Sequence, residues 1–381
     1  MKKNTVLFLV FALILPGLAA AQNARAASSR IPDQLIVQLQ PQASAEALLL
    51  DLNRQQPGSV QILRTVATRY NIHLFQFDPA RWRGDRLLAA LQKKREVDAV
   101  QYNYHISTRE TPDDPEYELQ WGVERIGTPA VWKAANGGGL TAQGDTIVVA
   151  IVDSGFDLQH EDLEDNIWRN PHEIPGDGID NDQHGFPDDI YGWDFVADSD
   201  SIRYGDHGLS VSGILGAKGN NSRGIAGINW NIKMMFLTIG RVDHIIASYE
   251  YVIEQRRRYN ESNGQEGAFI VATNASFGLA DPIFCEEQPV WGGMYDLLGE
   301  VGVLTGAGTA NRDRNVDEVG DMPTTCESEF LLTVLNGNED EERHAPSGYG
   351  EVSIDMAAPG EGTYTLRPFN RYGAWGGNSA A

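Results

Sequence analysis

The chain has few cysteines, few basic side chains and no long apolar run after its first 18 residues. Cys285 and Cys326 are the only cysteines, so the chain can form at most one internal disulfide. Its 30 Lys and Arg against 53 Asp and Glu give a net charge of −23, which disfavours nucleic-acid binding. No later segment is long and apolar enough for a membrane helix, so we expect no membrane attachment of the mature protein.

The N-terminus has the pattern of a secretory signal peptide. Lys2 and Lys3 precede an apolar stretch at 6–18, and three alanines at 19–21 supply a small-residue cleavage site. We therefore predict a signal peptide over residues 1–21 and a secreted or periplasmic protein. In that oxidising compartment the two cysteines are expected to form a disulfide, with two unpaired small hydrophobic side chains as the alternative.

Charge is divided unevenly along the chain. Residues 1–110 carry 14 Lys and Arg and 8 Asp and Glu, whereas the remaining residues carry 16 and 45. A basic leader before an acidic body suggests that the leader docks on the body. The alternative for the body alone is that its acidity keeps a secreted protein in solution.

The leader, residues 22–108, is predicted to be a small α+β domain. Its strands are expected where apolar and polar residues alternate, and its helices where apolar residues recur every three or four positions. The predicted strands are 35–39, 72–77 and 97–104, and the predicted helices are 43–52 and 85–94.

The body, residues 109–381, alternates continuous apolar runs with helical segments, which is typical of a parallel sheet covered by helices on both faces. The expected strands are 146–152, 232–239, 269–275 and 302–306, and the expected helices are 208–217, 245–258 and 291–301. In such α/β sheets ligands bind beyond the carboxyl ends of the strands. Asp153 follows directly after the first of these strands.

Three residues of the body could form a catalytic triad. A serine hydroxyl becomes an effective nucleophile when an imidazole removes its proton, and a carboxylate must hold that imidazole in the correct tautomer. Ser379, His207 and Asp153 are the candidates for these roles. The order Asp, His, Ser, with Asp153-Ser154-Gly155, His207-Gly208 and Gly377-Asn378-Ser379-Ala380-Ala381 around it, resembles the subtilisin-like serine peptidases over roughly residues 112–381.

This resemblance implies a secreted endopeptidase that hydrolyses proteins or peptides in extended form, without an organic cofactor. The leader would be an inhibitory prodomain removed by self-cleavage between Tyr104 and Asp113. The segment Ser276-Phe277-Gly278 resembles the strand edge along which the family binds substrate backbone. A plain exit from a strand into a loop is the alternative for this segment.

The sequence departs from the family pattern at several positions. Where the family usually supplies an asparagine amide to the oxyanion, this chain has Thr309, with Asn311 nearby, so either residue is a candidate. Leu209 and Asn378 each replace a usual threonine. Because only two alanines follow Ser379, we expect the chain to be a fragment of a longer peptidase, inactive or poorly folded as written.

An acidic segment of the body resembles the opening of a calcium loop. Asp180, Asp182 and the intervening Asn181 place oxygen ligands before Gly185, but His184 and Tyr191 interrupt the pattern. A solvated acidic loop is the alternative, so calcium is a possible ligand and no metal ligand is assigned. Two other functions remain open: a pseudoenzyme that binds peptides without cleaving them, and a secreted calcium-stabilised binding protein.

Overall fold

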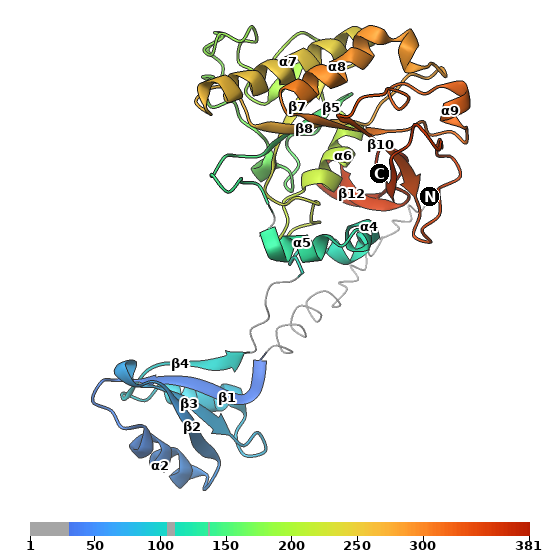
Figure 1. Ribbon diagram of the computed structural model, residues 1–381. Helices are drawn as coiled ribbons and strands as arrows, with labels where there is room; N and C mark the ends of the chain where they lie inside the picture. Colours follow the sequence, from blue (N-terminus) through green and yellow to red (C-terminus); the bar gives the residue numbers. More distant parts are fainter. Residues whose placement is uncertain (1–29, 105–110, 136–137) are drawn as a thin grey trace, which may run out of the picture. The chain divides into compact units, whose positions relative to one another are not determined.

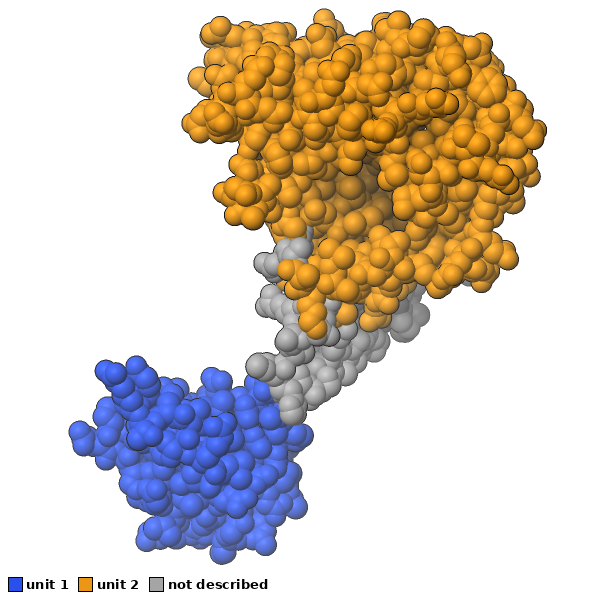
Figure 2. Space-filling view, in the orientation of Figure 1, with its two compact units in different colours: residues 1–108 blue, residues 109–381 orange. Residues whose placement is uncertain are grey.

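The computed structural model describes residues 30–104, 111–135 and 138–381, which form two compact units, Met1–Thr108 and Arg109–Ala381 (Figures 1 and 2). The predicted signal peptide and most of the predicted cleavage segment lie outside the described residues. Within the described ranges, no helix has both the length and the apolar character needed to cross a bilayer.

Over its described residues 30–104, the first unit is a four-stranded antiparallel sheet with the helices α2 and α3. The sheet order is β2-β3-β1-β4. Alternate side chains of β1, Leu35, Val37 and Leu39, are buried against Leu48 of α2 and Leu87 of α3. Sequence analysis did not predict β2, whose side chains are mostly exposed. The elements are β1 (Arg30–Leu39), α2 (Ala45–Gln55), β2 (Val60–Ala67), β3 (Ile72–Phe77), α3 (Gly84–Gln92), β4 (Val97–Tyr104) and the short 3-10 helix η1 (Thr68–Tyr70).

The second unit is built on a seven-stranded parallel sheet in the order β11-β10-β9-β8-β5-β7-β6, beside a β12–β13 hairpin. All four strands predicted for the body are present. Its strands are β5 (Val148–Asp153), β6 (Gly192–Asp194), β7 (Lys233–Thr238), β8 (Ile270–Ala275), β9 (Leu304–Gly308), β10 (Leu331–Gly337), β11 (Met356–Pro359), β12 (Thr363–Arg367) and β13 (Arg371–Trp375).

Helices cover both faces of this sheet, as predicted. Figure 1 shows α7 and α8 together on one face and α6 on the other. The helices are α4 (Trp121–Arg125), α5 (Thr128–Ala135), α6 (His207–Gly216), α7 (Val242–Ser262), α8 (Pro289–Glu300) and α9 (Val316–Val319), with 3-10 helices η2 (Tyr117–Leu119), η3 (Glu164–Asn166) and η4 (Cys285–Glu287). Helix α7 is longer than predicted, and Asn263, whose backbone is left-handed (φ 53°), caps its C-terminus.

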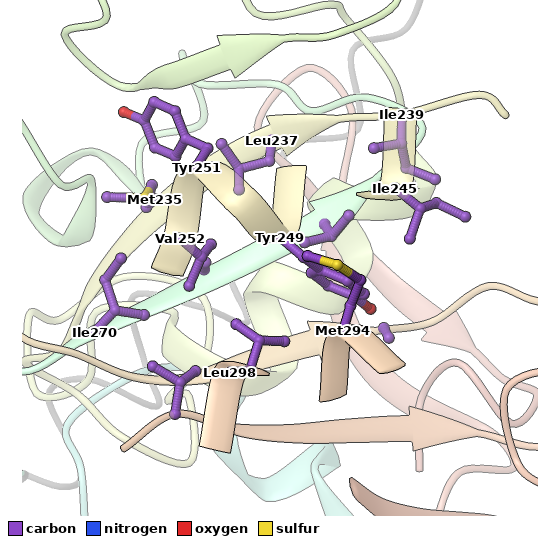
Figure 3. Close-up of a cluster of buried hydrophobic side chains, with 14 of the residues drawn as sticks. Met235, Leu237, Ile239, Ile245, Tyr249, Tyr251, Val252, Ile270, Met294 and Leu298 are labelled. Carbon is purple, nitrogen blue, oxygen red and sulfur yellow. The ribbon is translucent and has the colours of Figure 1, made fainter. Parts of the chain in front are cut away.

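Strand β5 divides the core in two because successive side chains of a strand point to opposite faces. Val148, Ala150 and Val152 join the cluster beneath α7 and α8, part of which is drawn in Figure 3. Val149 and Ile151 join the cluster around α6 and Leu366 of β12. The same alternation directs the side chain of Asp153, the last residue of β5, toward the face that carries α6.

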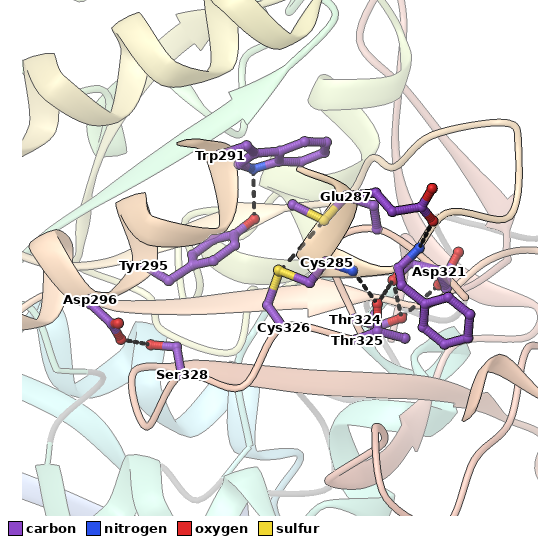
Figure 4. The surroundings of a disulfide bond; sticks show 12 residues. Cys285, Glu287, Trp291, Tyr295, Asp296, Asp321, Thr324, Thr325, Cys326 and Ser328 are labelled. Atoms are coloured by element: carbon purple, nitrogen blue, oxygen red, sulfur yellow. Dashed lines mark hydrogen bonds between the residues drawn. A yellow bond between two sulfur atoms is a disulfide. The ribbon is translucent and has the colours of Figure 1, made fainter. Parts of the chain in front are cut away.

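Cys285 and Cys326 form a disulfide, which confirms the pairing expected from the sequence (Figure 4). The bond joins η4, just before α8, to the segment that precedes β10. Gly292 of α8 lies against it, since a Cβ there would come within 2.6 Å of Cys285 Sγ. The disulfide therefore fixes the loop after β8 to the loop after α9, two segments that also line the candidate site described below.

Candidate active site

The structure brings Asp153 and His207 into direct contact. His207 Nδ1 lies 2.8 Å from both carboxylate oxygens of Asp153. Asp153 is buried, and its Oδ1 also accepts hydrogen bonds from the backbone N–H of Ser154 at 2.6 Å and the Ser154 hydroxyl at 3.1 Å. His207 is the first residue of α6, so its position follows from how that helix begins.

Helix α6 approaches the end of β5 closely because its second residue is glycine. A Cβ on Gly208 would come within 2.5 Å of the Gly155 carbonyl oxygen and 2.6 Å of the Phe156 ring. Any larger residue would therefore push the start of the helix away from the strand. The close approach places the imidazole of His207 within hydrogen-bonding reach of Asp153.

Ser379 completes a hydrogen-bonded chain of three residues. His207 Nε2 lies 3.2 Å from Ser379 Oγ, on the opposite side of the ring from Asp153. The Trp375 ring at the end of β13 meets the imidazole edge to face, at 5.2 Å between centroids. The carboxylate, imidazole and hydroxyl selected from the sequence thus lie together, in the order that proton transfer requires.

The surroundings of His207 favour its protonated form. Burial lowers the pKa of His207, but the hydrogen bond to Asp153, the Asp153 charge and the Asp206 charge together outweigh that effect, so the pKa is raised above its ordinary value. The imidazole is therefore a better proton acceptor here than in water.

Asn378 anchors the segment that carries Ser379, a contribution that sequence analysis did not identify. Its side chain accepts hydrogen bonds from the Asn336 N–H at 2.8 Å and the Ser347 hydroxyl at 2.5 Å. It also donates to the Ala310 carbonyl at 2.9 Å. This buried amide ties the loop after β9 and the end of β10 to the residue before Ser379. Its departure from the family pattern was the only sequence signal.

A cavity of about 200 Å³ opens beside Ser379. One wall is Ser276–Ala280, which leaves the end of β8, and the other is Gly308–Arg312, which leaves the end of β9. The predicted substrate segment Ser276, Phe277 and Gly278 therefore lies at the candidate nucleophile. Ser276 also contacts it directly, since its hydroxyl donates to the Ser379 carbonyl at 3.2 Å.

The two oxyanion candidates differ in their surroundings. Thr309 is buried, and its hydroxyl donates to Asp321 Oδ2 at 3.0 Å. Asn311 is exposed at the cavity, and its Oδ1 accepts the Asn378 N–H at 2.7 Å. That bond orients the Asn311 side chain, and its amide nitrogen has no acceptor within the described part of the chain. The hydroxyl of Thr309 is engaged elsewhere, whereas Asn311 has a donor available.

A second group of side chains could hold a cation. Ligand oxygens of Glu173, Asp182 and Asp189 all lie within 4.8 Å of one another, and Glu173 and Asp189 are buried. Burial raises the pKa of Asp189, although hydrogen bonds from His184, Tyr251 and Asn170 act in the opposite direction. The three carboxylates suit a hard, oxygen-seeking ion such as calcium.

The acidic loop is not arranged as the sequence pattern suggested. Asp180 accepts the backbone N–H groups of His184 and Gly185, at 2.9 and 2.7 Å, and thereby closes its own turn. Asp188 similarly accepts three backbone N–H groups of residues 176–178. Glu173 joins the cluster from outside the predicted motif. Some acidic residues of this loop, such as Asp180 and Asp188, therefore stabilise turns. Others, Asp182 and Asp189, lie with Glu173 in the carboxylate cluster.

The parallel sheet and the carboxylate, imidazole and hydroxyl at its carboxyl edge are features of an α/β serine hydrolase. Comparison with known proteins narrows this class. The model of the subtilase family matches residues 144–381, more than half of the chain. The chain belongs to the subtilase family.

Curated relatives include subtilisin-like protease 1 of Plasmodium berghei, 26% identical over 71% of this chain and 45% of its own length. The Plasmodium falciparum (isolate 3D7) protein of the same name is 26% identical over 69% of this chain and 39% of its own length. The chain thus spans less than half of these relatives. Thermitase of Thermoactinomyces vulgaris is 25% identical over 71% of this chain and 81% of its own length.

Solved structures support the fold. A protease of Pseudoalteromonas arctica superposes with a TM-score of 0.51 at 21% identity, covering 71% of this chain and 83% of its own. The epidermin leader peptide processing serine protease of Staphylococcus aureus gives a TM-score of 0.50 at 14% identity, covering 91% of this chain and 84% of its own. At these identities the likeness establishes the α/β fold alone.

The geometry predicts a perturbed titration of His207. Its pKa, measured by NMR, is expected above the ordinary value of about 6.5. Asp153→Asn should lower the pKa of His207, because the charge and the acceptor are lost, and Asp206→Asn should lower it less.

Since the pKa of His207 is raised in the folded protein, the stability linked to this group is fully present below the pKa of the unfolded state. It is lost as pH rises through the pKa of the folded state. An unchanged pKa in Asp153→Asn would contradict the assignment.

Proposed function

We propose that this chain is part of a secreted or periplasmic serine endopeptidase that cleaves proteins through an Asp153, His207 and Ser379 triad. The observation that carries the proposal is the continuous hydrogen-bonded path from Asp153 through His207 to Ser379, beside a cavity. Membership of the subtilase family supports the reaction class. The signal-peptide pattern at residues 1–21 supports the location.

In this mechanism the Ser379 hydroxyl attacks the carbonyl carbon of the scissile peptide bond while its proton passes to His207 Nε2. Asp153 accepts a hydrogen bond from the Nδ1–H of His207, which fixes the tautomer of the imidazole. The carboxylate also stabilises the imidazolium that forms. His207 then gives its proton to the departing amine, and the C–N bond breaks to leave an ester on Ser379. Water hydrolyses that ester with His207 acting again as base and then as acid.

Asn311 is our candidate for stabilising the negative oxygen of the tetrahedral intermediate. Its Oδ1 is held by the Asn378 N–H, which leaves its amide N–H groups available at the cavity. Thr309 is the weaker candidate because its hydroxyl donates to Asp321. The main chain of Ser276, Phe277 and Gly278 would pair with an extended substrate, so that affinity comes from backbone hydrogen bonds.

We further propose that residues 22–108 are a prodomain and that residues 109–381 carry the catalytic domain. The compact unit formed by Met1–Thr108 and its net positive charge against an acidic body support this division. The prodomain would act as an intramolecular inhibitor until self-cleavage between Tyr104 and Asp113.

Ser379→Ala is expected to abolish covalent labelling by a fluorophosphonate and to reduce kcat by about 10⁶-fold, because the nucleophile is lost. The same variant should accumulate as an uncleaved chain, observed by intact mass after expression of the full-length protein. Ser201→Ala, which removes an exposed hydroxyl elsewhere, is the matched control and should label normally.

Two results would favour other functions. A folded, processed wild-type protein that takes up no label would favour a peptide-binding pseudoenzyme of the same fold. Calcium-dependent binding of a partner that survives replacement of all three triad residues would favour a secreted binding protein.

Asn311→Ala should lower kcat by roughly 10²–10³-fold with a smaller effect on KM, because an oxyanion donor acts mainly in the transition state. Steady-state kinetics on one peptide substrate would measure both constants. Thr309→Val is the comparison: if it causes the larger loss in kcat while Asn311→Ala leaves kcat unchanged, the donor is Thr309.

We also propose that Glu173, Asp182 and Asp189 hold a structural calcium ion, which would neutralise their converging charges. Saturating calcium should raise Tm by about 5 °C relative to a chelator, as expected for a ligand present well above its Kd. Glu173→Gln should remove this shift, whereas Asp200→Asn, an exposed carboxylate outside the cluster, should keep it. A shift that persists in Glu173→Gln would show that calcium acts at another place.

A further inference from the structure

The cavity beside Ser379 has the size of a pocket for one side chain. Its volume of about 200 Å³ is below the roughly 300–1,000 Å³ of sites that enclose drug-sized ligands. Ser379 and Asn311 lie at its lining, together with Ser276–Gly278. Consider a peptide bound along Ser276–Gly278 with the carbonyl carbon of its scissile bond at Ser379. The residue that supplies this carbonyl would place its side chain in the pocket.

The pocket contains one carboxylate, but its hydrogen-bonding capacity is already used. Asp321 is buried and accepts the hydroxyls of Thr309 and Thr324, at 3.0 and 2.7 Å, and the Ala310 N–H at 2.9 Å. Arg314 Nη2 donates to Asp321 Oδ1 at 2.7 Å and balances its charge. An incoming lysine or arginine would therefore meet a neutralised and saturated partner.

Two guanidinium groups line the same pocket. Arg314 Nε is buried and has no hydrogen-bond partner within the described residues. Arg312 is exposed at the pocket and has no ion pair or side-chain hydrogen bond within residues 30–104, 111–135 and 138–381. The neighbouring Asp313 does not neutralise Arg312, because it pairs with Arg343 at 3.0 Å. The lining thus carries two guanidinium groups against one carboxylate.

We propose that this pocket selects a glutamate or aspartate side chain at the residue whose carbonyl carbon Ser379 attacks, with Arg312 as the specificity-determining residue. The proposal rests on the proposed endopeptidase function. An entering carboxylate would pair with the exposed Arg312 guanidinium through charge-assisted hydrogen bonds. Such places are few in the body, since residues 111–381 hold 16 Lys and Arg, including Arg312 and Arg314, against 45 Asp and Glu.

The chain's own sequence contains a fitting substrate. Glu110 is the only acidic residue between Tyr104 and Asp113, the segment in which self-cleavage is predicted. Cleavage after Glu110 would leave Thr111 as the first residue of the body.

The test measures kcat/KM of the full-length protein on peptides that differ only at the residue before the scissile bond: Glu, Gln, Leu or Lys. Glu should exceed Gln by roughly five- to tenfold at low salt, and the ratio should fall as salt is raised. Arg312→Gln should bring the Glu to Gln ratio close to one. Arg223→Gln, which removes an exposed charge outside the pocket, should keep the wild-type ratio.

Failure of this proposal is separable from failure of the proposed function. If the Leu and Gln peptides are cleaved in a Ser379-dependent manner but Glu has no advantage, or its advantage survives Arg312→Gln, the pocket does not select by charge. If no peptide is cleaved and Ser379 takes up no fluorophosphonate, the endopeptidase function itself is wrong and the specificity falls with it.

Discussion

The close contact between the start of α6 and the end of β5 is the constraint on which the site depends. Gly208 allows this contact, because a side chain there would collide with the Gly155 carbonyl and the Phe156 ring. The alternation of side chains along β5 turns Asp153 toward α6. The close approach of the helix then brings His207 within hydrogen-bonding distance of this carboxylate. A shift of α6 by one side-chain width would separate the carboxylate from the imidazole.

The same helix positions Ser379 from its other side. The β12–β13 hairpin packs on α6, where the Thr365 hydroxyl donates to the Ser210 carbonyl at 2.6 Å and Leu366 enters the core. Gly213 permits this packing, since a Cβ would come within 2.5 Å of Leu366. The hairpin ends at Trp375, against the His207 ring, four residues before Ser379. Helix α6 thus carries His207 and, through the hairpin packed on it, supports the segment of Ser379. Gly208 and Gly213 allow the close packing on its two sides.

The sequence predicted those parts of the structure that depend on local periodicity. Strand β5 is a continuous apolar run up to Asp153, and helix α6 consists mainly of small and apolar residues that are mostly buried, so their patterns were clear. Strand β2 and the β12–β13 hairpin were not predicted, because many of their side chains are partly or fully exposed and no clear apolar alternation marks them. The triad residues could be selected because their neighbours resemble a known family, whereas their distances could come only from the fold.

Other site residues lie beyond sequence reasoning for a physical reason. Whether Thr309 or Asn311 can donate at the cavity depends on their partners. Asp321 accepts the Thr309 hydroxyl, whereas the Asn378 N–H orients the side-chain amide of Asn311. Glu173 lies close to Asp182 and Asp189 because the intervening loop folds back on it. The backbone N–H groups of Asn181 and Asp182 donate to Glu173 Oε1. Such partners are chosen by tertiary contacts, and no spacing rule encodes them.

The charge of the whole body and the charge of one pocket act over different distances. In physiological salt, electrostatic interactions between exposed groups decay within about 8 Å, so the many acidic residues of the body act mainly on their own neighbours. A substrate side chain inside the cavity beside Ser379 would instead respond to Arg312, Arg314 and Asp321, which line it. An acidic protein can therefore carry a locally basic pocket, and selection there depends on which of these three charges is left without a partner.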